Sequence, residues 1–507
     1  MGAVALTSPD LLGELLGRAS GAQRRWAETS WNERGALLAR VANVLLERMD
    51  ELAATVTAET GKPLFESYTF ELFPALDGVC WTAANAARLL RPERIRRHVL
   101  LGQKRGFVVY RPIGVVALIT PWNVPFAVPF TQAVAAVAAG NAVVVKPSEL
   151  TPLSGEWVGR VFDEADAPAG LVTIVQGYGE TTGGALAASP DVRKVIFTGS
   201  QKTGRRVAVA AGESLRPVTL ELGGKDPMLV FEDADVDRTV DGALWAAFSN
   251  CGQVCTGVER IYVERGLYET FVEELTRRAG ALRIGRGEEL DTELGPLIST
   301  ERRTRVEELV ADATEHGADV RSGARRPDID LPGWFYEPTV LASVPAEADL
   351  TREEIFGPVV TVAAFTGEEE AVSLANDSRY GLGASVWTRD LDRAARVGRR
   401  LEAGSVWTND HAYSYALARA PWGGRKGSGF GSTHSRHGLY ECSQVTFADV
   451  DTGRFGVPWW FPYSARAVDG FKGLLEAFYG RGLVTRVGAA ARHRRGLFHV
   501  ARRLLRR

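Results

Sequence analysis

The spacing of apolar positions predicts a helical region followed by alternating strands and helices. Residues about 30 to 92 are expected to be helical, because Leu37, Leu38, Val41, Val44 and Leu45 recur at helical spacing. Short apolar runs then predict strands at Val115–Ile119, Ala142–Val145, Val172–Val175, Lys194–Phe197, Val218–Leu220 and Met228–Val230. Their alternation with helical segments predicts a parallel sheet with right-handed crossovers.

The alternation restarts after about Gly223, which predicts a second α/β domain. The expected helices and strands of this domain lie at Asp241–Ser249, Arg260–Val263, Tyr268–Arg278, Val359–Ala364 and Ser385–Trp387. Upstream of the first parallel strand, Val108, Val109 and Tyr110 indicate a hairpin within the segment from His98 to Val116. No internal repeat of short period interrupts this organisation.

One uncharged stretch, Pro112 to Val145, is long enough to cross a bilayer. Proline and glycine residues interrupt it, however, at Pro121, Pro125, Pro129 and Gly140. We therefore expect a strand at Gly114–Thr120, a helix at Phe130–Ala139 and a strand at Ala142–Val145. A βαβ unit that is covered on both faces is apolar throughout, so the stretch predicts a buried unit rather than a membrane span.

Composition narrows the class of protein. The 507 residues are 45% apolar and 24% charged, which excludes a disordered, collagen-like or coiled-coil chain. At roughly 150 residues per domain, this length predicts about three domain-sized units or two large ones. Four cysteines are too few for a disulfide scaffold, and the N-terminus lacks a basic region before an apolar core. We expect a cytoplasmic protein without a signal peptide.

The net charge of −2 hides an asymmetry along the chain. From Val457 to Arg507 there are eleven Lys and Arg residues against two acidic ones, a local charge of +9. The remaining residues therefore carry −11. An acidic body with a basic tail indicates a surface-binding segment.

Three residues stand out as candidates for catalysis. Cys255 follows a helical stretch at a glycine-containing turn, where backbone N–H groups can stabilise a thiolate; the alternatives are a buried structural cysteine or a metal pair with Cys251. Glu221 ends a strand before two glycines and suits a general base; the alternative is a surface ion pair with Lys225. Asn123 offers two amide N–H donors for an oxyanion; the alternative is a turn residue.

Other motifs suit a dinucleotide. Lys146 and Glu149 follow a strand and could reach a ribose. Gly199, Ser200 and Gly204 lie where a strand runs into a helix, whose first N–H groups can hold a pyrophosphate. Their Gly-x4-Gly spacing differs from the standard Gly-x-Gly-x-x-Gly fingerprint.

In their order along the chain, these motifs resemble those of the NAD(P)-dependent aldehyde dehydrogenase superfamily. The motifs that carry the resemblance are Pro121-Trp-Asn123, Lys146-Pro-Ser-Glu149, Phe197-Thr-Gly-Ser200, Glu221-Leu-Gly-Gly-Lys225, Gly252-Gln-Val-Cys255, Glu353-Glu-Ile-Phe-Gly-Pro358 and Pro421-Trp-Gly-Gly424. The similarity runs from about residue 30 to about 450. The tail-bearing layout is also similar to some actinobacterial proteins labelled succinic semialdehyde dehydrogenase.

The resemblance implies an aldehyde-dehydrogenase-like α/β fold. A Rossmann-type parallel-sheet cofactor domain would comprise residues 1–93 and 113–222, and a second α/β catalytic domain residues 223–442. Residues 94–112 and 443–452 would form a β oligomerisation flap of a homodimer or homotetramer. Residues 453–507 remain as a basic, aromatic C-terminal tail.

The resemblance also implies a role for each site residue. Cys255 would be the nucleophile that forms a thiohemiacetal and then a thioester, Glu221 the base that activates water, and Asn123 the oxyanion donor. The cofactor would be held by Trp122, Lys146, Ser148, Glu149, Gly179, Gly199, Ser200, Gly204, Leu222, Glu354 and Phe356. No metal is expected. NAD is expected in preference to NADP, because a carboxylate at Glu149 would repel a 2′-phosphate.

Departures from the family pattern bear on the substrate. Ser432 and Thr433 replace an Arg-Glu pair, and Ser249 and Thr131 stand where succinic semialdehyde members place arginines. Val124, Val128 and Trp422, with Tyr413 and Tyr415, instead predict an apolar or aromatic pocket and an aldehyde to match. Alternatives are a succinic semialdehyde dehydrogenase, a CoA-acylating dehydrogenase, or a silent protein that keeps the fold.

The tail from 457 to 507 lies beyond the resemblance. Aromatic residues cluster at Trp459, Trp460, Phe461 and Tyr463, and helically spaced apolar residues with arginines follow. This pattern is typical of an interfacial helix at a membrane, or of a segment that docks on an acidic neighbouring subunit. We expect no nucleic-acid partner, and peripheral membrane association is the alternative to a purely cytoplasmic location.

Overall fold

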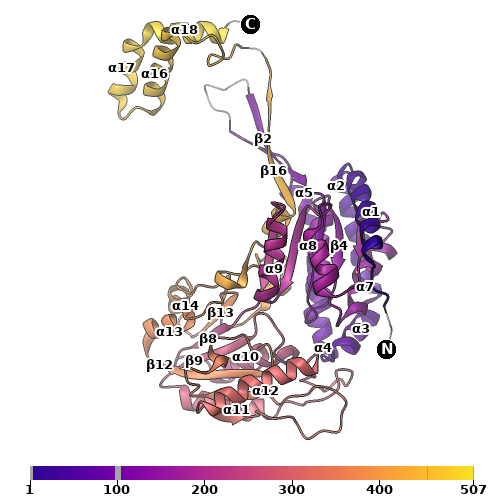
Figure 1. Ribbon diagram of the computed structural model, residues 1–507. Coiled ribbons are helices and arrows are strands. Elements are labelled where there is room, and N and C mark those ends of the chain that lie inside the picture. Colours follow the sequence, from indigo (N-terminus) through magenta and orange to yellow (C-terminus); the bar gives the residue numbers. More distant parts are fainter. Residues whose placement is uncertain (1–3, 97–103, 454, 506–507) are drawn as a thin grey trace. The chain divides into compact units, whose positions relative to one another are not determined.

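The computed structural model describes residues 4–96, 104–453 and 455–505, and it divides the chain into two units (Figure 1). The larger unit comprises Met1–Leu90 and Arg111–Gln444, and the smaller one Arg91–Tyr110 and Val445–Arg507. Cofactor and catalytic parts are thus expected within one unit, and the flap and tail within the other. The finer four-part division stays a prediction. The predicted hairpin includes residues 97–103, His98 among them, which lie outside the described residues.

The predicted helical region is present, and a further helix precedes it. The helices of this region are α1 (Pro9–Ala27), α2 (Trp31–Glu47), α3 (Met49–Thr60), α4 (Leu64–Glu66), the π-helix η1 (Ser67–Leu72) and α5 (Phe73–Leu89). Ser30 and Glu33 form a reciprocal capping box at the start of α2. The predicted apolar face of α2 is buried, at Leu37, Leu38 and Val41.

The first sheet has the strand order β15-β7-β6-β3-β4-β5. Its strands are β3 (Val115–Ile119), β4 (Ala142–Lys146), β5 (Val172–Ile174), β6 (Lys194–Gly199), β7 (Val218–Leu222) and β15 (Gly429–Phe430). All pair in parallel except β15, which is antiparallel to β7. The first five predicted strands are confirmed.

The uncharged stretch is a buried βαβ unit, as predicted. Helix α6 (Ala127–Ala138) lies between β3 and β4, and all its residues are buried. Helices α7 (Pro152–Glu164), α8 (Gly184–Ala188) and α9 (Gln201–Gly212) follow β4, β5 and β6 in turn. Within the described residues, no helix combines the length and hydropathy needed to cross a bilayer.

The second sheet has the order β10-β11-β12-β9-β8-β13-β14. Its strands are β8 (Asp226–Val230), β9 (Val258–Glu264), β10 (Asp319–Ser322), β11 (Thr339–Ala342), β12 (Val359–Phe365), β13 (Gly383–Trp387) and β14 (Ser405–Thr408). The predicted strand Met228–Val230 therefore belongs here, and its prediction as part of the first sheet is wrong. Strand β8 pairs in parallel with β9 and β13, and such long-range pairing leaves no local signal in sequence.

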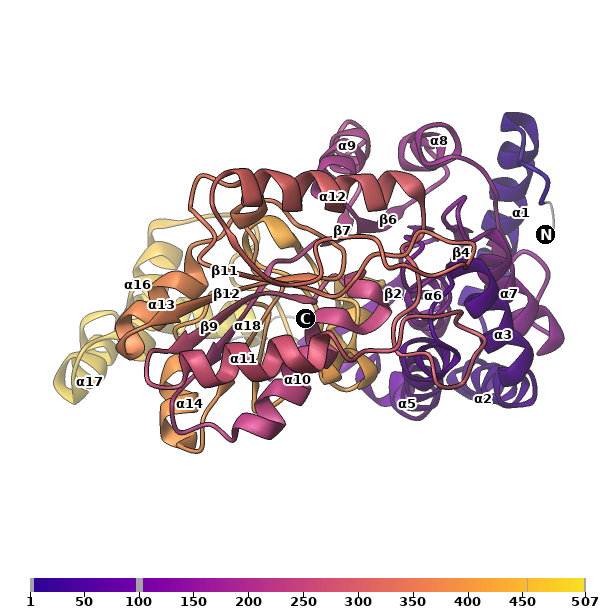
Figure 2. The same ribbon diagram turned by 90° about the horizontal axis from the view of Figure 1, so that it is seen from below.

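Both faces of this sheet are covered by helices (Figure 2). Met228 and Val230 face a core with α10 (Val236–Phe248), α11 (Tyr268–Ala279) and α12 (Thr300–Glu315). Leu229, between them, faces a second core with α13 (Gly367–Asn376) and α14 (Leu391–Gly398). Burial on both faces explains why these strands are apolar throughout rather than alternating.

The smaller unit contains a three-stranded sheet and a helical tail. Its sheet has the order β1-β2-β16, with β1 (Glu93–Arg94), β2 (Lys104–Pro112) and β16 (Ser443–Asp451). Strand β1 is antiparallel to β2, and Lys104 pairs with Asp451 at 3.2 Å. The tail forms α16 (Ala465–Tyr479), α17 (Leu483–Arg492) and α18 (Arg494–Leu505).

Candidate active site

The parallel order of the first sheet brings the predicted cofactor motifs to one edge. Five neighbouring strands, β7-β6-β3-β4-β5, end at this edge. The residues at or after the strand ends are Trp122 and Asn123 for β3, Lys146, Ser148 and Glu149 for β4, Gly179 for β5, Gly199 and Ser200 for β6, and Glu221 and Leu222 for β7. Ligands of open α/β sheets bind outside this edge.

A cavity of about 600 Å³ opens beside these strand ends. Its lining includes most of the predicted site: Trp122, Asn123, Val124, Val128, Gly199, Ser200, Glu221, Leu222, Cys255, Glu354, Phe356 and Trp422. Five predicted residues lie outside this lining: Lys146, Ser148, Glu149, Gly179 and Gly204. All three candidate catalytic residues therefore share one cavity.

The residues outside the cavity lining form a neighbouring group. Lys146 Nζ lies 2.9 Å from Glu149 Oε2, and the Gly179 backbone also hydrogen-bonds the Glu149 carboxylate. Burial alone would raise the pKa of Glu149, but the ion pair and hydrogen bonds lower it. Ser148 is buried beside them, and Gly204 packs so closely on Leu222 that a Cβ would lie 2.6 Å from its side chain. A charged, partly exposed carboxylate thus stands at the end of β4.

A strained turn precedes Cys255. The short helix η4 (Ser249–Gly252) holds Asn250 and Cys251 at φ of 50° and 56°, a region that side chains disfavour. Gly252 follows at φ 69°, where an added Cβ would lie 2.0 Å from the Gly357 carbonyl oxygen. Such strain concentrates at functional sites because the surrounding structure must enforce it.

Hydrogen bonds tie this turn to the loop that carries Asn123. Asn123 Nδ2 donates to the Gln253 carbonyl at 2.9 Å, and Asn250 Nδ2 donates to the Asn123 carbonyl at 3.0 Å. Lys62 Nζ donates to the same carbonyl at 2.8 Å. The Asn123 amide carries a second N–H, and the residue lines the cavity.

The protein alone does not favour a thiolate at Cys255. Burial raises the pKa of its thiol, and the carboxylates of Asp226, Glu221 and Glu354 raise it further. Cys251 differs in its surroundings, because it is buried in the core of the second sheet and does not line the cavity. No group of three or more potential metal ligands occurs among the described residues.

Glu221 is buried and lines the cavity. It has no ion-pair partner among the described residues. Burial raises its pKa well above the ordinary value, the charge of Glu441 adds to this, and the Thr433 hydroxyl opposes it. The alternative of a surface pair with Lys225 is wrong. Lys225, in the loop between β7 and β8, is buried and pairs with Glu259 of β9 at 2.7 Å.

The two glycines after Glu221 allow close packing beside the thiol. A Cβ at Gly223 would lie 2.3 Å from the Glu354 carboxylate, and one at Gly224 would lie 2.3 Å from the Cys255 carbonyl oxygen. Gly224 N donates to Glu354 Oε1 at 3.0 Å. Burial raises the pKa of Glu354 to about 8. The Glu-Leu-Gly-Gly motif therefore contributes Glu221 to the cavity, and its two glycines allow the Glu354 carboxylate and the Cys255 backbone to approach closely.

Aromatic residues form part of the cavity lining, here called the aromatic wall. Its rings belong to Phe70, Phe73, Trp245, Tyr413, Tyr415, Trp422 and His434. Tyr415 packs edge-on against Trp422, with ring centroids 5.1 Å apart, and against His434, at 5.3 Å. Tyr415 Oη and His434 Nε2 are both buried without a hydrogen-bond partner among the described residues. The wall is thus aromatic, with polar atoms on its tyrosine, tryptophan and histidine rings.

Several of these residues have no signal in the sequence. Glu259 accepts the backbone N–H groups of Ile355 and Phe356 and so holds the loop that carries Glu354. Arg302 donates to the carbonyls of the same two residues. The rings of Phe70, in the π-helix η1, and Trp245, in α10, stack with their centroids 5.8 Å apart.

Comparison with known proteins supplies an independent finding. A family model described as "Aldehyde dehydrogenase family" matches residues 1–448. The betaine aldehyde dehydrogenase of Bacillus subtilis (strain 168) is 40% identical over 437 residues, which cover 86% of this chain and 88% of that protein. Aminoaldehyde dehydrogenase 1, peroxisomal, of Pisum sativum is 37% identical over 416 residues, or 82% of each chain.

A solved structure agrees with the sequence relatives. The betaine aldehyde dehydrogenase from Staphylococcus aureus in complex with NAD+ superposes with a TM-score of 0.86 at 35% identity. The match covers 90% of this chain and 91% of that one.

Proposed function

Since the chain belongs to the aldehyde dehydrogenase family and is an oxidoreductase acting on aldehydes, we propose that it oxidises ω-aminoaldehydes to amino acids with NAD. The relatives named for betaine aldehyde and aminoaldehyde set the substrate class considered. The single observation that carries the choice within this class is the pair of unpartnered polar atoms, Tyr415 Oη and His434 Nε2, in the aromatic wall.

The hydrogen-bond chain behind His434 decides what it can bind. Thr433 lies beside Glu221, and its hydroxyl opposes the rise in the pKa of that carboxyl. His434 Nδ1 lies 3.2 Å from Thr433 Oγ1, and we propose that Nδ1 carries the proton of this hydrogen bond. In that tautomer Nε2 would carry the lone pair of the ring, and burial, which lowers the pKa of His434 to about 4, keeps the ring neutral.

A primary ammonium group matches this wall. It donates N–H bonds to Nε2 and to Tyr415 Oη, and its charge is attracted by the ring faces of Tyr415 and Trp422. A trimethylammonium group has no N–H to donate. A carboxylate would need a cation, and Arg302, the one Lys or Arg among the described lining residues, is turned to the carbonyls of Ile355 and Phe356.

The residues at the strand ends fit NAD. Ser200 caps the exposed N-terminus of α9, whose twelve residues give a helix dipole suited to a pyrophosphate. The charged Glu149 beside Lys146 accepts hydrogen bonds from a ribose 2′-OH and repels a 2′-phosphate. Trp122, Leu222, Glu354 and Phe356 line the cavity and would lie beside the nicotinamide and its ribose, and Ser148, Gly179 and Gly204 would lie on the adenosine side.

The proposed reaction uses three protein groups. The Cys255 thiolate adds to the aldehyde carbon, and the free N–H of Asn123 donates to the resulting oxyanion. NAD, when bound, accepts the hydride, and its positive ring also favours the thiolate that the carboxylates around Cys255 disfavour. Glu221 then takes a proton from water, which hydrolyses the Cys255 thioester to the acid.

The test is a matched series of aldehydes of equal length that end in a primary ammonium, a trimethylammonium, a methyl or a carboxylate group. Wild-type kcat/KM should be highest for the primary ammonium. His434→Leu should lower that value by about 10- to 100-fold, since a hydrogen bond to a charged group contributes roughly 1.5–3 kcal/mol, and should leave the methyl-terminated aldehyde unchanged. Equal losses across the series would contradict the proposed contact.

The Cys255→Ala variant tests the type of reaction independently of the choice of substrate. This variant should lose NADH formation with every aldehyde, whereas Cys251→Ala should retain it because Cys251 does not line the cavity. Product that appears only when coenzyme A is added would instead favour an acylating enzyme, against the role of Glu221. Equal efficiency with NADP would contradict the role of Glu149.

A second candidate substrate is an apolar or aromatic aldehyde. Val124 and Val128 pack with Tyr415 as one apolar cluster, and Phe70 and Phe73 add rings without polar atoms to the wall. Under this alternative, the methyl-terminated aldehyde would exceed the primary ammonium in wild-type kcat/KM, and the two candidates are thus decided by one series.

A further inference from the structure

The tail helices bury small residues and expose large apolar ones. Gly470, Gly473 and Gly496 form the contact between α16 and α18, and a Cβ at Gly470 would lie 2.2 Å from the Gly496 carbonyl oxygen. The other buried positions of the three helices are Ala467, Ala489 and Val500. Close packing through glycine and alanine is typical of helices whose outer surface meets lipid. In a domain surrounded by water alone, the leucines and aromatic residues would occupy the interior.

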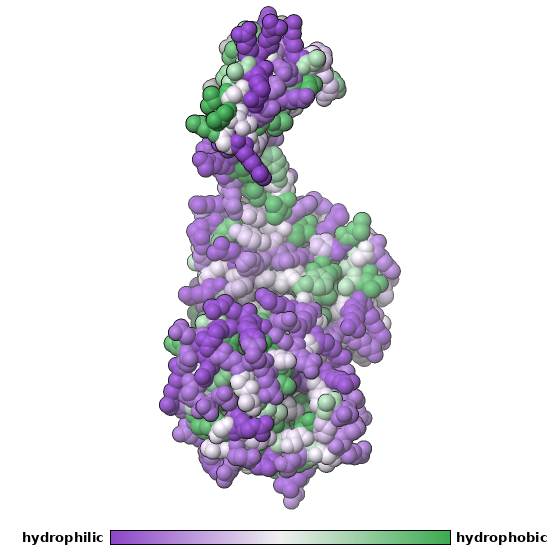
Figure 3. All heavy atoms as spheres, turned by 90° about the vertical axis from the view of Figure 1, so that its left-hand side faces the viewer, coloured by the Kyte–Doolittle hydropathy of each residue, from purple (hydrophilic) through white to green (hydrophobic). Residues whose placement is uncertain are grey.

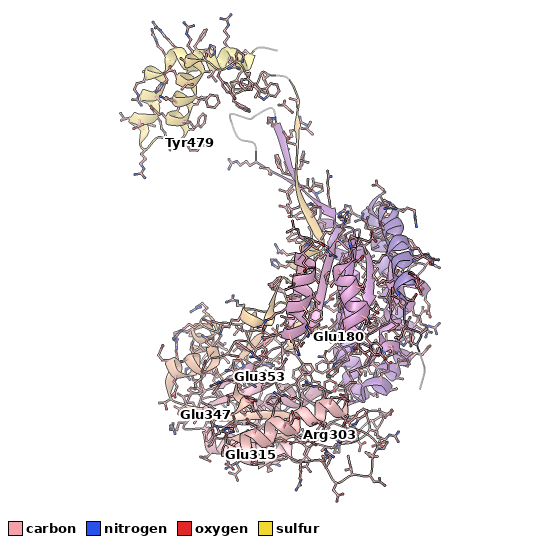
Figure 4. All side chains as sticks on the ribbon, viewed as in Figure 1. Glu180, Arg303, Glu315, Glu347, Glu353 and Tyr479 are labelled. Atoms are coloured by element: carbon pink, nitrogen blue, oxygen red, sulfur yellow. The ribbon has the colours of Figure 1, made fainter. Side chains whose placement is uncertain are left out.

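Within the tail, a group of exposed apolar residues lies at the turn between α16 and α17. Leu483, Val484 and Val487 at the start of α17 are 79%, 88% and 65% exposed. Leu475 and Tyr479 at the end of α16 are 54% and 66% exposed, and Figure 4 labels Tyr479 at this turn. We call these five residues, with Phe478, the apolar tip. In the space-filling view, apolar and charged side chains alternate over the tail helices (Figure 3).

The tail helices also carry exposed basic side chains, and the acids of the tail are already occupied. Asp469 accepts from His493 Nδ1 at 2.7 Å, and Glu476 pairs with Arg492 at 2.5 Å. The exposed cations include Lys472, Arg481, Arg486, Arg494, Arg495 and Arg502, and no acidic partner is recorded for them among the described residues. The tail therefore presents unpaired positive charge together with exposed apolar side chains.

We propose that this tail binds an anionic phospholipid surface, with the apolar tip inserted and the arginines at the headgroups. An apolar protrusion needs either a matching groove or a surface that yields, and a lipid interface yields. Long arginine side chains reach the phosphates while their methylene groups stay in the apolar region. A second cluster at Trp459, Trp460, Phe461 and Tyr463, 38% to 79% exposed, has the residue types enriched at membrane interfaces. The binding is peripheral.

A second copy of the chain is the competing partner, because the body carries a net charge of −11. Charge alone would permit that contact. It does not account for small residues inside the tail and large apolar residues outside it, since a protein interface would bury the tip only against a groove of matching shape. The lipid surface accounts for the charge, the protrusion and the glycine packing together.

The experiment is vesicle flotation of the full-length enzyme. Vesicles of phosphatidylcholine alone are compared with vesicles that also contain phosphatidylglycerol. The enzyme should float with the anionic vesicles at least about tenfold more, and less at 1 M salt, where the Debye length falls to about 3 Å. Leu483→Ser/Val484→Ser should lower flotation at least about tenfold even on anionic vesicles, because it removes two inserted apolar side chains.

A matched control comes from the larger unit. Leu215 and Leu290 are 94% and 86% exposed there, so Leu215→Ser/Leu290→Ser removes equal apolar surface away from the tail and should float like the wild type. NADH formation equal to the wild type shows that each variant is folded. Flotation of the tip variant at the wild-type level, or no flotation of the wild type with anionic vesicles, overturns the proposal. If the wild type does not float, and light scattering without lipid gives the tip variant a lower mass than the wild type, the tip is assigned to a contact between copies instead.

Discussion

The buried pair Lys62 and Glu71 offers a sharp test of how the helical region supports the catalytic loop. Both side chains are fully buried, and Lys62 Nζ lies 2.8 Å from Glu71 Oε1. Lys62 also donates to the Asn123 carbonyl at 2.8 Å. The second carboxylate oxygen of Glu71 accepts the backbone N–H groups of Phe126 and Ala127, at the start of α6. Lys62→Met therefore leaves a buried carboxylate without its cation.

The expected loss of stability follows from that burial. Removing one partner of a buried ion pair costs about 3–5 kcal/mol, because the remaining charge is desolvated and uncompensated. Glu71 keeps its two N–H donors, so we expect the lower end of that range. In the double variant Lys62→Met/Glu71→Gln no charge is left buried, and the loss should be smaller than for Lys62→Met alone. The two substitutions should thus be strongly non-additive.

The assay is guanidinium-induced unfolding followed by tryptophan fluorescence, together with steady-state NADH formation. Since we propose Asn123 as the oxyanion donor, Lys62→Met should also lower kcat, by up to about 10²-fold, the range for losing such a donor altogether. The exposed pair Arg18 and Glu14, with side chains 66% and 56% exposed, is the matched control, and Arg18→Met should change neither quantity measurably. Additive losses in the double variant, or an unchanged Lys62→Met, would refute the reasoning.

Three further outcomes are expected. Gly252→Ala should abolish NADH formation and lower soluble yield, because the methyl group would meet the Gly357 carbonyl at 2.0 Å and φ is 69°. Burial raises the pKa of Glu221 and the Thr433 hydroxyl opposes this, so Thr433→Val should shift the rising limb of the pH profile of kcat/KM to higher pH; an unshifted limb would exclude Glu221 as the base that Thr433 influences. Burial raises the pKa of Asp226 to about 8, so the folded state binds this proton more tightly than the unfolded state does. Proton binding by Asp226 therefore contributes fully to stability below the ordinary pKa of 3.8, and that contribution is lost as pH rises toward 8. Asp226→Asn should flatten this decline when unfolding midpoints are measured from about pH 4 to 8.

Local pattern was sufficient for most elements of the fold. The strands of the first sheet, the apolar face of α2 and the buried βαβ unit each follow from the spacing of residues within about thirty positions. Their burial on both faces makes them apolar, and that property is visible in sequence. The strand β8 was assigned to the wrong sheet, since its neighbours β9 and β13 are about 30 and 155 residues away and pairing over such distances has no local signature.

The candidate site divides in the same way. Cys255, Glu221 and Asn123 were identified because glycine and proline around them mark turns at strand ends. Their partners were not, and Lys225 shows why. Its spacing suggested a pair with Glu221, but the course of the backbone turns it to Glu259. Glu259 and Arg302 hold the Glu354 loop through backbone groups, which any sequence supplies.

Sequence by itself determined the alternation of strands and helices, the order of the catalytic motifs and the charge difference between body and tail. These are properties of neighbouring residues and of composition. Tertiary structure alone decided that Thr433 lies between Glu221 and His434, that Phe70 and Trp245 complete an aromatic wall, and that the tail packs through glycines with its large apolar side chains outside. Each of these depends on which residues, distant along the chain, are brought within hydrogen-bond or van der Waals distance, and only packing of the whole chain determines that.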